Sequence, residues 1–193
     1  MKRRDFCLGA LGAVGLVAFG GAVRTASAAT PLLRPPGGFD EDALIGACVR
    51  CDRCRSVCPH GCIALGSLEE GWLNTETPVM DFSRGYCDFC ADDPAGPRCI
   101  RVCPTGALDG ASPHAEAIGC AVLDAELCVN CYKCVPACEY EALAWDETNL
   151  VPVVDEQKCN GCGACEYVCP SASFGYYDGS TRRAIAVERG DVR

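Results

Sequence analysis

The stretch CVRCDRCRSVCP, residues 48–59, places four cysteines at spacings of two, two and three residues and closes with a proline. Three later stretches repeat it. The second copy, CDFCADDPAGPRCIRVCP (87–104), keeps four cysteines and the proline, but eight residues separate its second and third cysteines. The third copy, CVNCYKCVPAC (128–138), has regular spacing and is followed by Glu139 instead of proline. The fourth copy, CNGCGACEYVCP (159–170), is regular and closes with proline. Self-similarity of this kind indicates one structural unit used four times.

Cysteine dominates the composition, with 19 in 193 residues, which is typical of either a disulfide scaffold or a metal protein. Cysteines three positions apart on one tight loop cannot all pair without strain, which argues against disulfides. Zinc usually takes isolated C-x2-C pairs rather than three cysteines at two-residue spacing with a fourth close behind. The spacing C-x2-C-x2-C-x3-C-P is that of the bacterial ferredoxin motif, which holds [4Fe–4S] clusters through soft thiolates.

Sixteen cysteines are therefore the predicted ligands of four [4Fe–4S] clusters. They are Cys48, Cys51, Cys54, Cys58, Cys87, Cys90, Cys99, Cys103, Cys128, Cys131, Cys134, Cys138, Cys159, Cys162, Cys165 and Cys169. Cys7 lies in the N-terminal segment, and Cys62 and Cys120 are expected to be small packing residues. In other repeats the position of Cys62 is taken by alanine or serine, and a buried thiol packs much as these do.

The first 28 residues read as an export signal: MKRRDF is basic, a short apolar run rich in glycine follows, and ASA supplies a small-residue cleavage site. Arg3 and Arg4 indicate a twin-arginine signal, which exports proteins already folded and suits a cofactor inserted in the cytoplasm. A retained membrane anchor is the alternative. These residues contribute +3 to a formal charge of −9, so the mature chain would be near −12. Such a surface is a poor partner for nucleic acid.

The expected fold class is α+β and ferredoxin-like: two pseudo-symmetric dicluster modules of bacterial type, with short strands, short helices and many loops. Apolar runs end in an aspartate four residues ahead of the motifs at 128 and 159, so each unit should be strand, cysteine loop, one helical turn, strand. The expected segments are a signal (1–28), a Pro/Gly lead-in ending in a helix (29–47), motifs 1 and 4 (48–76 and 149–181), motifs 2 and 3 (77–110 and 119–148) and a C-terminal tail (182–193).

The layout resembles the exported multi-cluster ferredoxin-type proteins of the MauM/NapG family. The resemblance rests on the signal, the lead-in LLRPPG, the first motif, the stretched second motif ending CPTGALD, and the two later motifs. It implies an electron carrier in the periplasm, between a membrane quinol-oxidising partner and an exported oxidoreductase such as periplasmic nitrate reductase. The regular third motif followed by Glu139 departs from the nitrate-reductase members. It favours the alternative of an iron–sulfur subunit of a molybdopterin oxidoreductase, formate dehydrogenase or hydrogenase.

The resemblance also implies how the clusters are shared, because the fourth cysteine of each motif ligates a different cluster. Pairing motif 1 with motif 4, and motif 2 with motif 3, gives the sets Cys48/Cys51/Cys54/Cys169, Cys159/Cys162/Cys165/Cys58, Cys87/Cys90/Cys99/Cys138 and Cys128/Cys131/Cys134/Cys103. Sequential pairing is the alternative, since the short gap between motifs 3 and 4 resembles that of a two-cluster ferredoxin.

Catalysis is not expected. His60 and His114 are the only histidines, no Gly-rich nucleotide motif is present, and each motif has a full set of four cysteines, whereas a sensor usually keeps an incomplete cluster. No small-molecule substrate is expected either. The insert ADDPAGPR between Cys90 and Cys99 is predicted to form a surface loop that serves as a docking element. Glu139 is expected either to lower the reduction potential of a nearby cluster or to face solvent.

Overall fold

A computed structural model describes residues 32–173 and 182–190, and the predicted signal at 1–28 lies outside them. The lead-in turns at 36–37 and enters helix α2 (Glu41–Ala47), whose first turn is capped by the Asp40 side chain accepting from the Ala43 amide at 3.0 Å. Leu44 carries the buried face of this helix. The helix expected within DEDALIGA is therefore confirmed.

The first half of the chain continues with α3 (Arg53–Ser56), β1 (Ile63–Leu65), the 3-10 turn η1 (Leu68–Glu70), β2 (Pro78–Met80) and α4 (Arg98–Val102). β1 and β2 form an antiparallel hairpin with Ile63 opposite Met80. This hairpin lies between motif 1 and motif 2 in the sequence. It therefore brings the ends of the two motifs toward each other.

The second half contains β3 (Cys120–Leu123), η2 (Ala125–Leu127), β4 (Leu143–Asp146), β5 (Val151–Val154), α5 (Ala164–Tyr167), η3 (Ser171–Ser173) and β6 (Ile185–Glu188). β4 and β5 form an antiparallel hairpin between motifs 3 and 4. β3 pairs antiparallel with β6, with Cys120 opposite Glu188. The strands expected before the third and fourth motifs are thus present as β3 and β5.

Strand β6 corrects one expectation, because it lies in the segment predicted to be a C-terminal tail. Its residues alternate in burial, with Ile185 and Val187 inward, and this alternation is typical of a strand with one buried face. Arg189, just after it, forms an ion pair with Glu41 at 2.8 Å and stacks over the Phe39 ring at 4.6 Å. The last described strand is therefore tied to the start of the fold.

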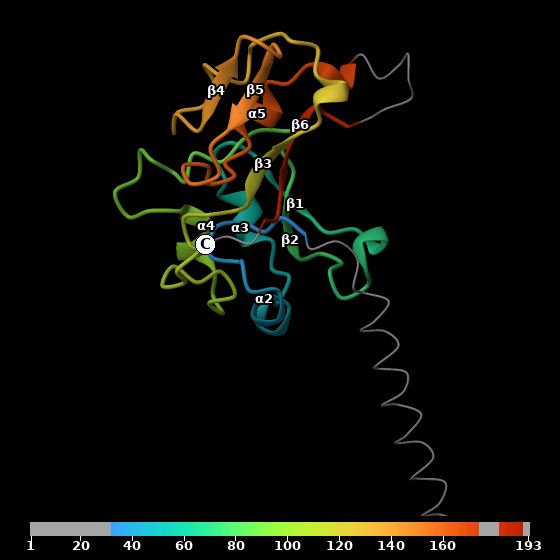
Figure 1. Cartoon of the computed structure of the whole chain (residues 1–193). Helices are drawn as coiled ribbons and strands as arrows, with labels where there is room; N and C mark the ends of the chain where they lie inside the picture. Colours follow the sequence, from blue (N-terminus) through green and yellow to red (C-terminus); the bar gives the residue numbers. More distant parts are fainter. Residues whose placement is uncertain (1–31, 174–181, 191–193) are drawn as a thin grey trace, which may run out of the picture.

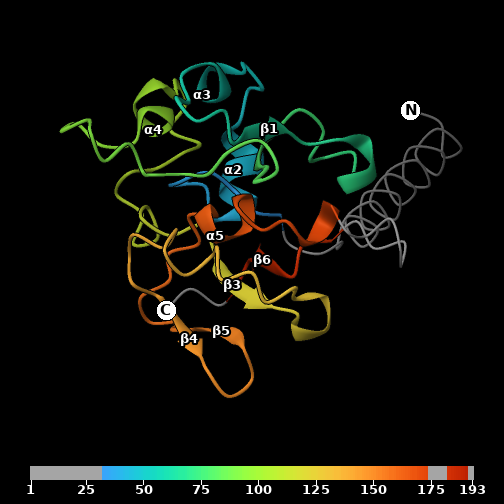
Figure 2. The same cartoon turned by 90° about the horizontal axis from the view of Figure 1, so that it is seen from above.

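Two small cores follow this division of the chain. One is built around Leu44, Ile63, Phe82 and Leu108, and the other around Leu143 and Ile185, and cysteines of the motifs pack against both. Figures 1 and 2 show α3, α4 and the β1–β2 hairpin on one side and β3, β4 and β5 on the other. We call these the first module (residues 32–118) and the second module (residues 119–173 and 182–190). Short strands, short helices and many loops fit the expected ferredoxin-like fold. The first module lacks a counterpart of the β3–β6 pair among its described residues.

Candidate metal centres

Each motif begins as a tight loop with an unusual backbone. In three motifs the residue before the second cysteine and the residue after it both have positive φ. The pairs are Arg50 and Asp52 (54° and 60°), Asn130 and Tyr132 (54° and 64°), and Gly161 and Gly163 (73° and 80°). Left-handed φ costs a non-glycine residue roughly 1–2 kcal/mol, so the loops accept strain to aim three thiols inward.

The stretched motif shares only the start of this geometry. Phe89, before its second cysteine, has φ 55°, but the next positive φ (55°) falls on Cys90 itself, and the insert begins directly afterwards. Asp93 holds the insert by accepting from Arg101 at 2.9 and 3.0 Å and from Arg98 at 3.2 Å. These arginines keep the pKa of Asp93 at about 2. The insert is thus clamped onto α4, the helix that carries Cys99.

The sixteen predicted ligands line four pockets, and every pocket combines three cysteines of one motif with the fourth cysteine of its neighbour. We number the sites by the motif that supplies three cysteines. Site 1 is lined by Cys48, Cys51, Cys54 and Cys103; site 2 by Cys87, Cys90, Cys99 and Cys58; site 3 by Cys128, Cys131, Cys134 and Cys169; site 4 by Cys159, Cys162, Cys165 and Cys138.

This grouping of the pockets differs from the pairing favoured from the sequence, in which motif 1 joins motif 4 and motif 2 joins motif 3, and it agrees with the sequential alternative. The structure groups the motifs sequentially. The physical reason lies in the two hairpins, β1–β2 and β4–β5, which connect consecutive motifs and leave each pair side by side. The exchange of fourth cysteines between partners is as expected; only the identity of the partner differs.

Short helices make the exchange possible in the first module. Helix α3 carries Cys54 into site 1, and the chain just beyond its end delivers Cys58 to site 2; helix α4 carries Cys99 into site 2, and Cys103 follows it into site 1. The two helices contact each other, so sites 1 and 2 flank them. In the second module α5 carries Cys165 into site 4, with Cys169 reaching site 3.

Burial and hydrogen bonds shift the pKa values of several of these cysteines in opposite directions. Burial raises the pKa of Cys54 to about 11 and that of Cys99 to about 12. A hydrogen bond with the Cys62 thiol lowers the pKa of Cys58 to about 5. For Cys169 burial acts to raise the pKa, but the hydrogen bonds that it receives, led by that of the Ser171 hydroxyl, outweigh burial and lower it. Because iron binds thiolates, assembly at the loop cysteines must release protons.

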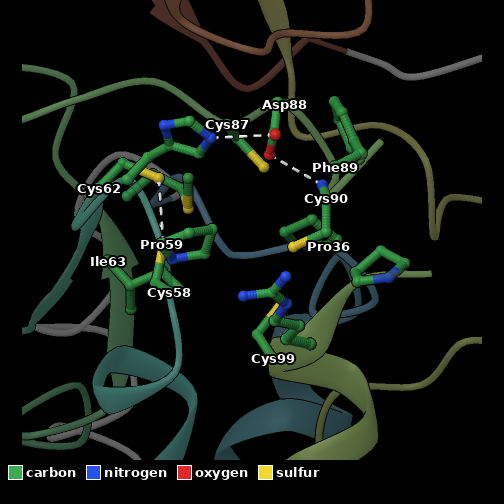
Figure 3. Close-up of a pocket in the computed structure, with 14 residues that line it drawn as sticks. Pro36, Cys58, Pro59, Cys62, Ile63, Cys87, Asp88, Phe89, Cys90 and Cys99 are labelled. Atoms are coloured by element: carbon green, nitrogen blue, oxygen red, sulfur yellow. Dashed lines mark hydrogen bonds and ion pairs between the residues drawn. The ribbon is translucent and has the colours of Figure 1, made fainter. Parts of the chain in front are cut away.

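Site 2 contains a fifth cysteine. Figure 3 shows Cys62 beside Cys58 and Cys87, and its sulfur lies 3.6 Å from that of Cys58. Cys62 is 1% exposed and lies directly before β1, which fits its expected packing role. Hydrogen bonds to both ligand cysteines and burial raise the pKa of Cys62, so this thiol keeps its proton beside them. This contact with site 2 was not expected from the sequence. The extra cysteine four positions after Cys58 is the signal that could have found it.

The donor sets fit [4Fe–4S] clusters: each pocket offers four soft thiolates, supplied in the three-plus-one manner of the ferredoxin motif. The cysteines of a site surround a pocket rather than a point. Across 32–173 and 182–190, no three His, Cys, Asp or Glu residues are placed to hold a single metal ion.

The two modules meet where site 2 approaches site 4. The Cys87 amide donates to the Cys162 carbonyl at 2.8 Å, joining a loop cysteine of each site. Gly163 makes the approach possible, because a Cβ there would lie 2.1 Å from the Phe82 ring. Gly161 is similarly close to the backbone of Gly119. Both glycines therefore serve the positive φ and a close approach, which for Gly163 joins the two modules and for Gly161 lies within the second module.

The remaining candidates lie at the margins of the sites. Glu139 is exposed, in keeping with the solvent-facing alternative. His60 pairs with Asp88 at 2.9 Å beside site 2, and the His114 ring contacts the Phe39 ring at a centroid distance of 4.5 Å and an angle of 38°. Cys120 is half-buried at the start of β3. No helix in the described part of the chain is long and apolar enough to cross a membrane.

Family models and relatives agree with this geometry. A 4Fe–4S dicluster domain model matches residues 121–174, within the second module, and a 4Fe–4S binding domain model matches residues 45–67, around motif 1. The ferredoxin-type protein NapG of Escherichia coli is 37% identical over 181 residues, covering 83% of this chain and 75% of its own. The methylamine utilization ferredoxin-type protein MauM of Paracoccus denitrificans is 35% identical over 191 residues, covering 88% and 83%. The chain belongs to the NapG/MauM family of ferredoxin-type proteins and is a 4Fe–4S electron-transfer component.

Proposed function

We propose that sites 1 to 4 each hold one [4Fe–4S] cluster and that the chain relays electrons between two redox partners without catalysing a reaction itself. The observation that carries the proposal is the exchange of fourth cysteines, made twice, once in each module. A bound [4Fe–4S] cluster supplies a one-electron carrier whose potential depends on its surroundings. The residues that line each site determine these surroundings.

The four sites lie in the order 1, 2, 4, 3. Sites 1 and 2 share the α3–α4 pair, sites 2 and 4 meet at the Cys87–Cys162 hydrogen bond, and sites 4 and 3 share α5. The ends of this row reach the surface, since Cys51 in site 1 and Cys131 in site 3 are the two exposed cysteines of the described chain. Site 2 and site 4 are interior. This order supports a relay with one partner at each end.

Hydrogen-bond donors reach cysteine sulfurs in all four sites, and two of them in site 4 are backbone amides. The Ala121 amide donates to the Cys159 sulfur at 3.4 Å, and the Ala142 amide donates to the Cys138 sulfur at 3.3 Å. Donors to ligand sulfur stabilise negative charge and raise a reduction potential. Site 2 has the Cys62 thiol as a donor, site 1 has the Thr105 hydroxyl 3.8 Å from the Cys103 sulfur, and site 3 has the Ser171 hydroxyl 3.3 Å from the Cys169 sulfur. Each site therefore has at least one donor that would raise the reduction potential of its cluster.

The proposed setting follows the resemblance of the chain to exported carriers. A twin-arginine signal at 1–28 would deliver the folded, cluster-loaded protein to the periplasm or the outer face of the cell membrane. The proposed partners are a membrane quinol dehydrogenase-type protein and an exported oxidoreductase such as periplasmic nitrate reductase. The relative MauM is named for methylamine utilization, so an oxidoreductase of that kind is a further partner to test.

An iron and acid-labile sulfide count on anaerobically purified protein tests the cofactor content. Four cubane clusters give roughly sixteen irons and sixteen sulfides per chain. About four irons, or stoichiometric zinc, would refute the proposal.

A non-additivity experiment tests the sharing of ligands. Cys48→Ala with Cys51→Ala should remove site 1 and about four irons. Adding Cys103→Ala should then cost no further iron, because Cys103 lines the same site. A further loss of about four irons would instead place Cys103 in a different cluster.

A further inference from the structure

The junction of sites 2 and 4 contains an arginine that no cysteine motif includes. Arg183 lies two residues before β6, in the second module. Its Nη1 atom donates to two backbone carbonyls, that of Phe82 at 3.0 Å and that of Glu166 at 2.6 Å. Phe82 belongs to the first module and Glu166 to the second. One nitrogen atom of Arg183 therefore joins the two modules.

On the second module, Arg183 holds the helix that supplies cysteines to two sites. The Glu166 carbonyl lies in α5, which carries Cys165 into site 4. The same carbonyl accepts from the Cys169 amide at 3.1 Å, where the chain leaves the helix toward site 3. Carbonyls in the last turn of a helix need partners from outside the helix. The bond from Arg183 therefore fixes the end of α5.

On the first module, the carbonyl that Arg183 binds is linked closely to site 2. Asp81, the residue before Phe82, donates its amide to the Cys62 carbonyl at 2.8 Å. Cys62 in turn lies beside Cys58 and Cys87 of site 2 (Figure 3). Arg183 thus connects, through a few hydrogen bonds, a segment fixed to site 2 with the helix of site 4.

The charge of Arg183 is offset by nearby carboxylates. Burial raises the pKa of Glu166, and the Val187 amide and the charge of Arg183 lower it. The charge of Asp81 raises this pKa further, so both carboxylates lie near the guanidinium. The junction is therefore not electropositive. Arg183 contributes two directed, charge-assisted hydrogen bonds, one to each module.

We propose that Arg183 is a positioning residue that sets the spacing of sites 2 and 4, and with it the electron-transfer step between the modules. The proposal rests on the proposed function, because it concerns one step of that relay. Electron transfer between buried sites slows steeply as their separation grows, so the step depends on the bonds that hold the sites in place. One electron leaves one site and arrives at the other, so the step needs no further reactant.

Arg189 provides a matched control, because it also joins the two modules. It pairs with Glu41 at 2.8 Å and lies over the Phe39 ring at 4.6 Å. Neither partner belongs to α3, α4 or α5, the helices that carry cysteines of the sites. Arg183→Met and Arg189→Met each remove an arginine bridge between the modules. An effect of Arg183→Met alone would therefore point to the spacing of the sites.

EPR of the fully reduced, cluster-loaded protein reports the spacing, because the spins of neighbouring reduced sites interact more weakly as their separation grows. Arg183→Met should lose part of the interaction present in the wild type. Arg183→Lys, which keeps a charged donor nitrogen, should recover it, and Arg189→Met should give the wild-type spectrum. Freeze-quenched samples taken after addition of less than one equivalent of reductant should show slower equilibration between the modules in Arg183→Met.

The proposal would be overturned by equal changes in Arg183→Met and Arg189→Met, or by an equilibration rate that Arg183→Met leaves unchanged. Arg183→Met should keep the roughly sixteen irons of the wild type. Loss of iron from this variant, with Arg189→Met fully loaded, would make Arg183 a residue required for assembly and would also overturn the proposal. Failure of the proposed function is distinguishable, because the wild type itself would then lack iron and a reduced signal.

Discussion

The contact between Gly163 and Phe82 predicts that Gly163→Ala will weaken the junction of the two modules. The new Cβ would lie 2.1 Å from a ring that is 3% exposed and cannot swing aside. At φ 80° an alanine also costs roughly 1–2 kcal/mol, and overpacking adds roughly 1–3 kcal/mol. The expected destabilisation is about 2–5 kcal/mol, a large share of the stability of an ordinary domain.

Gly96→Ala is the matched control. Gly96 has φ 78°, almost the same backbone, and a Cβ there would meet nothing within 4 Å. It should therefore cost only the conformational part, about 1–2 kcal/mol. The difference of about 1–3 kcal/mol corresponds to roughly 2–12 °C in the melting temperature of a chain of this size.

The assay is the apparent melting temperature of anaerobic, cluster-loaded protein, followed by visible circular dichroism. Phe82→Leu provides a second check, because a smaller side chain should reduce the penalty of Gly163→Ala toward that of Gly96→Ala. Equal losses for the two glycine substitutions, or a penalty unchanged by Phe82→Leu, would refute the reasoning.

Two other predictions follow from partners within the sites. Cys62→Ala should keep the full iron count, whereas Cys58→Ala should lose the cluster of site 2. Because the Cys62 thiol lies 3.6 Å from the Cys58 sulfur, Cys62→Ala should lower the reduction potential of that cluster, which an EPR titration measures. Loss of iron in Cys62→Ala would instead show that Cys62 is a ligand. Burial raises the pKa of Glu166 above its ordinary value, and the hydrogen bond from the Val187 amide offsets part of this rise. Because the folded protein holds this proton more tightly than the unfolded chain, the free energy of unfolding should fall as pH rises above about 4.5. Glu166→Gln should therefore gain stability relative to the wild type between pH 5 and pH 8, by less than about 1 kcal/mol because solvent screens the group, and the difference in melting temperature between the two proteins measures this gain.

The sequence carried most of the local structure. Two-residue spacers and a closing proline predicted the tight loops, and the apolar runs ahead of Asp124 and Asp155 predicted β3 and β5, as found. These succeed because a loop of fixed spacing and a short apolar strand are determined by neighbours in the chain. The sharing of ligands between two clusters could also be predicted from the sequence, because each motif itself contains the fourth cysteine.

The cysteines alone do not show which two motifs share clusters, because the spacing within a motif is the same whichever motif receives its fourth cysteine. The signal lay between the motifs instead. LAWDETNLVPVV (143–154) reads as two strands joined by a polar turn, and IALGSLEEGWLNTETPVM (63–80) is a longer version. Consecutive strands usually pair, so each hairpin points to sequential pairing. The pairing implied by the resemblance differs from the grouping of the pockets, which follows the sequential alternative.

The residue after the second cysteine differs between the inner site 4 and the end sites 1 and 3. The backbone requires a positive φ there, and glycine is the residue that meets this requirement without strain. Site 4 has Gly163, and its missing side chain lets that loop press against Phe82 in the interior. Sites 1 and 3 place Asp52 and Tyr132 at the same point, accepting strain. A chain that retains side chains where glycine would be more stable gains something else from them, and at both positions they stand beside the exposed cysteine of an end site. The loop of the inner site is therefore packed within the molecule, whereas the loops of the two end sites carry different side chains beside an exposed cysteine.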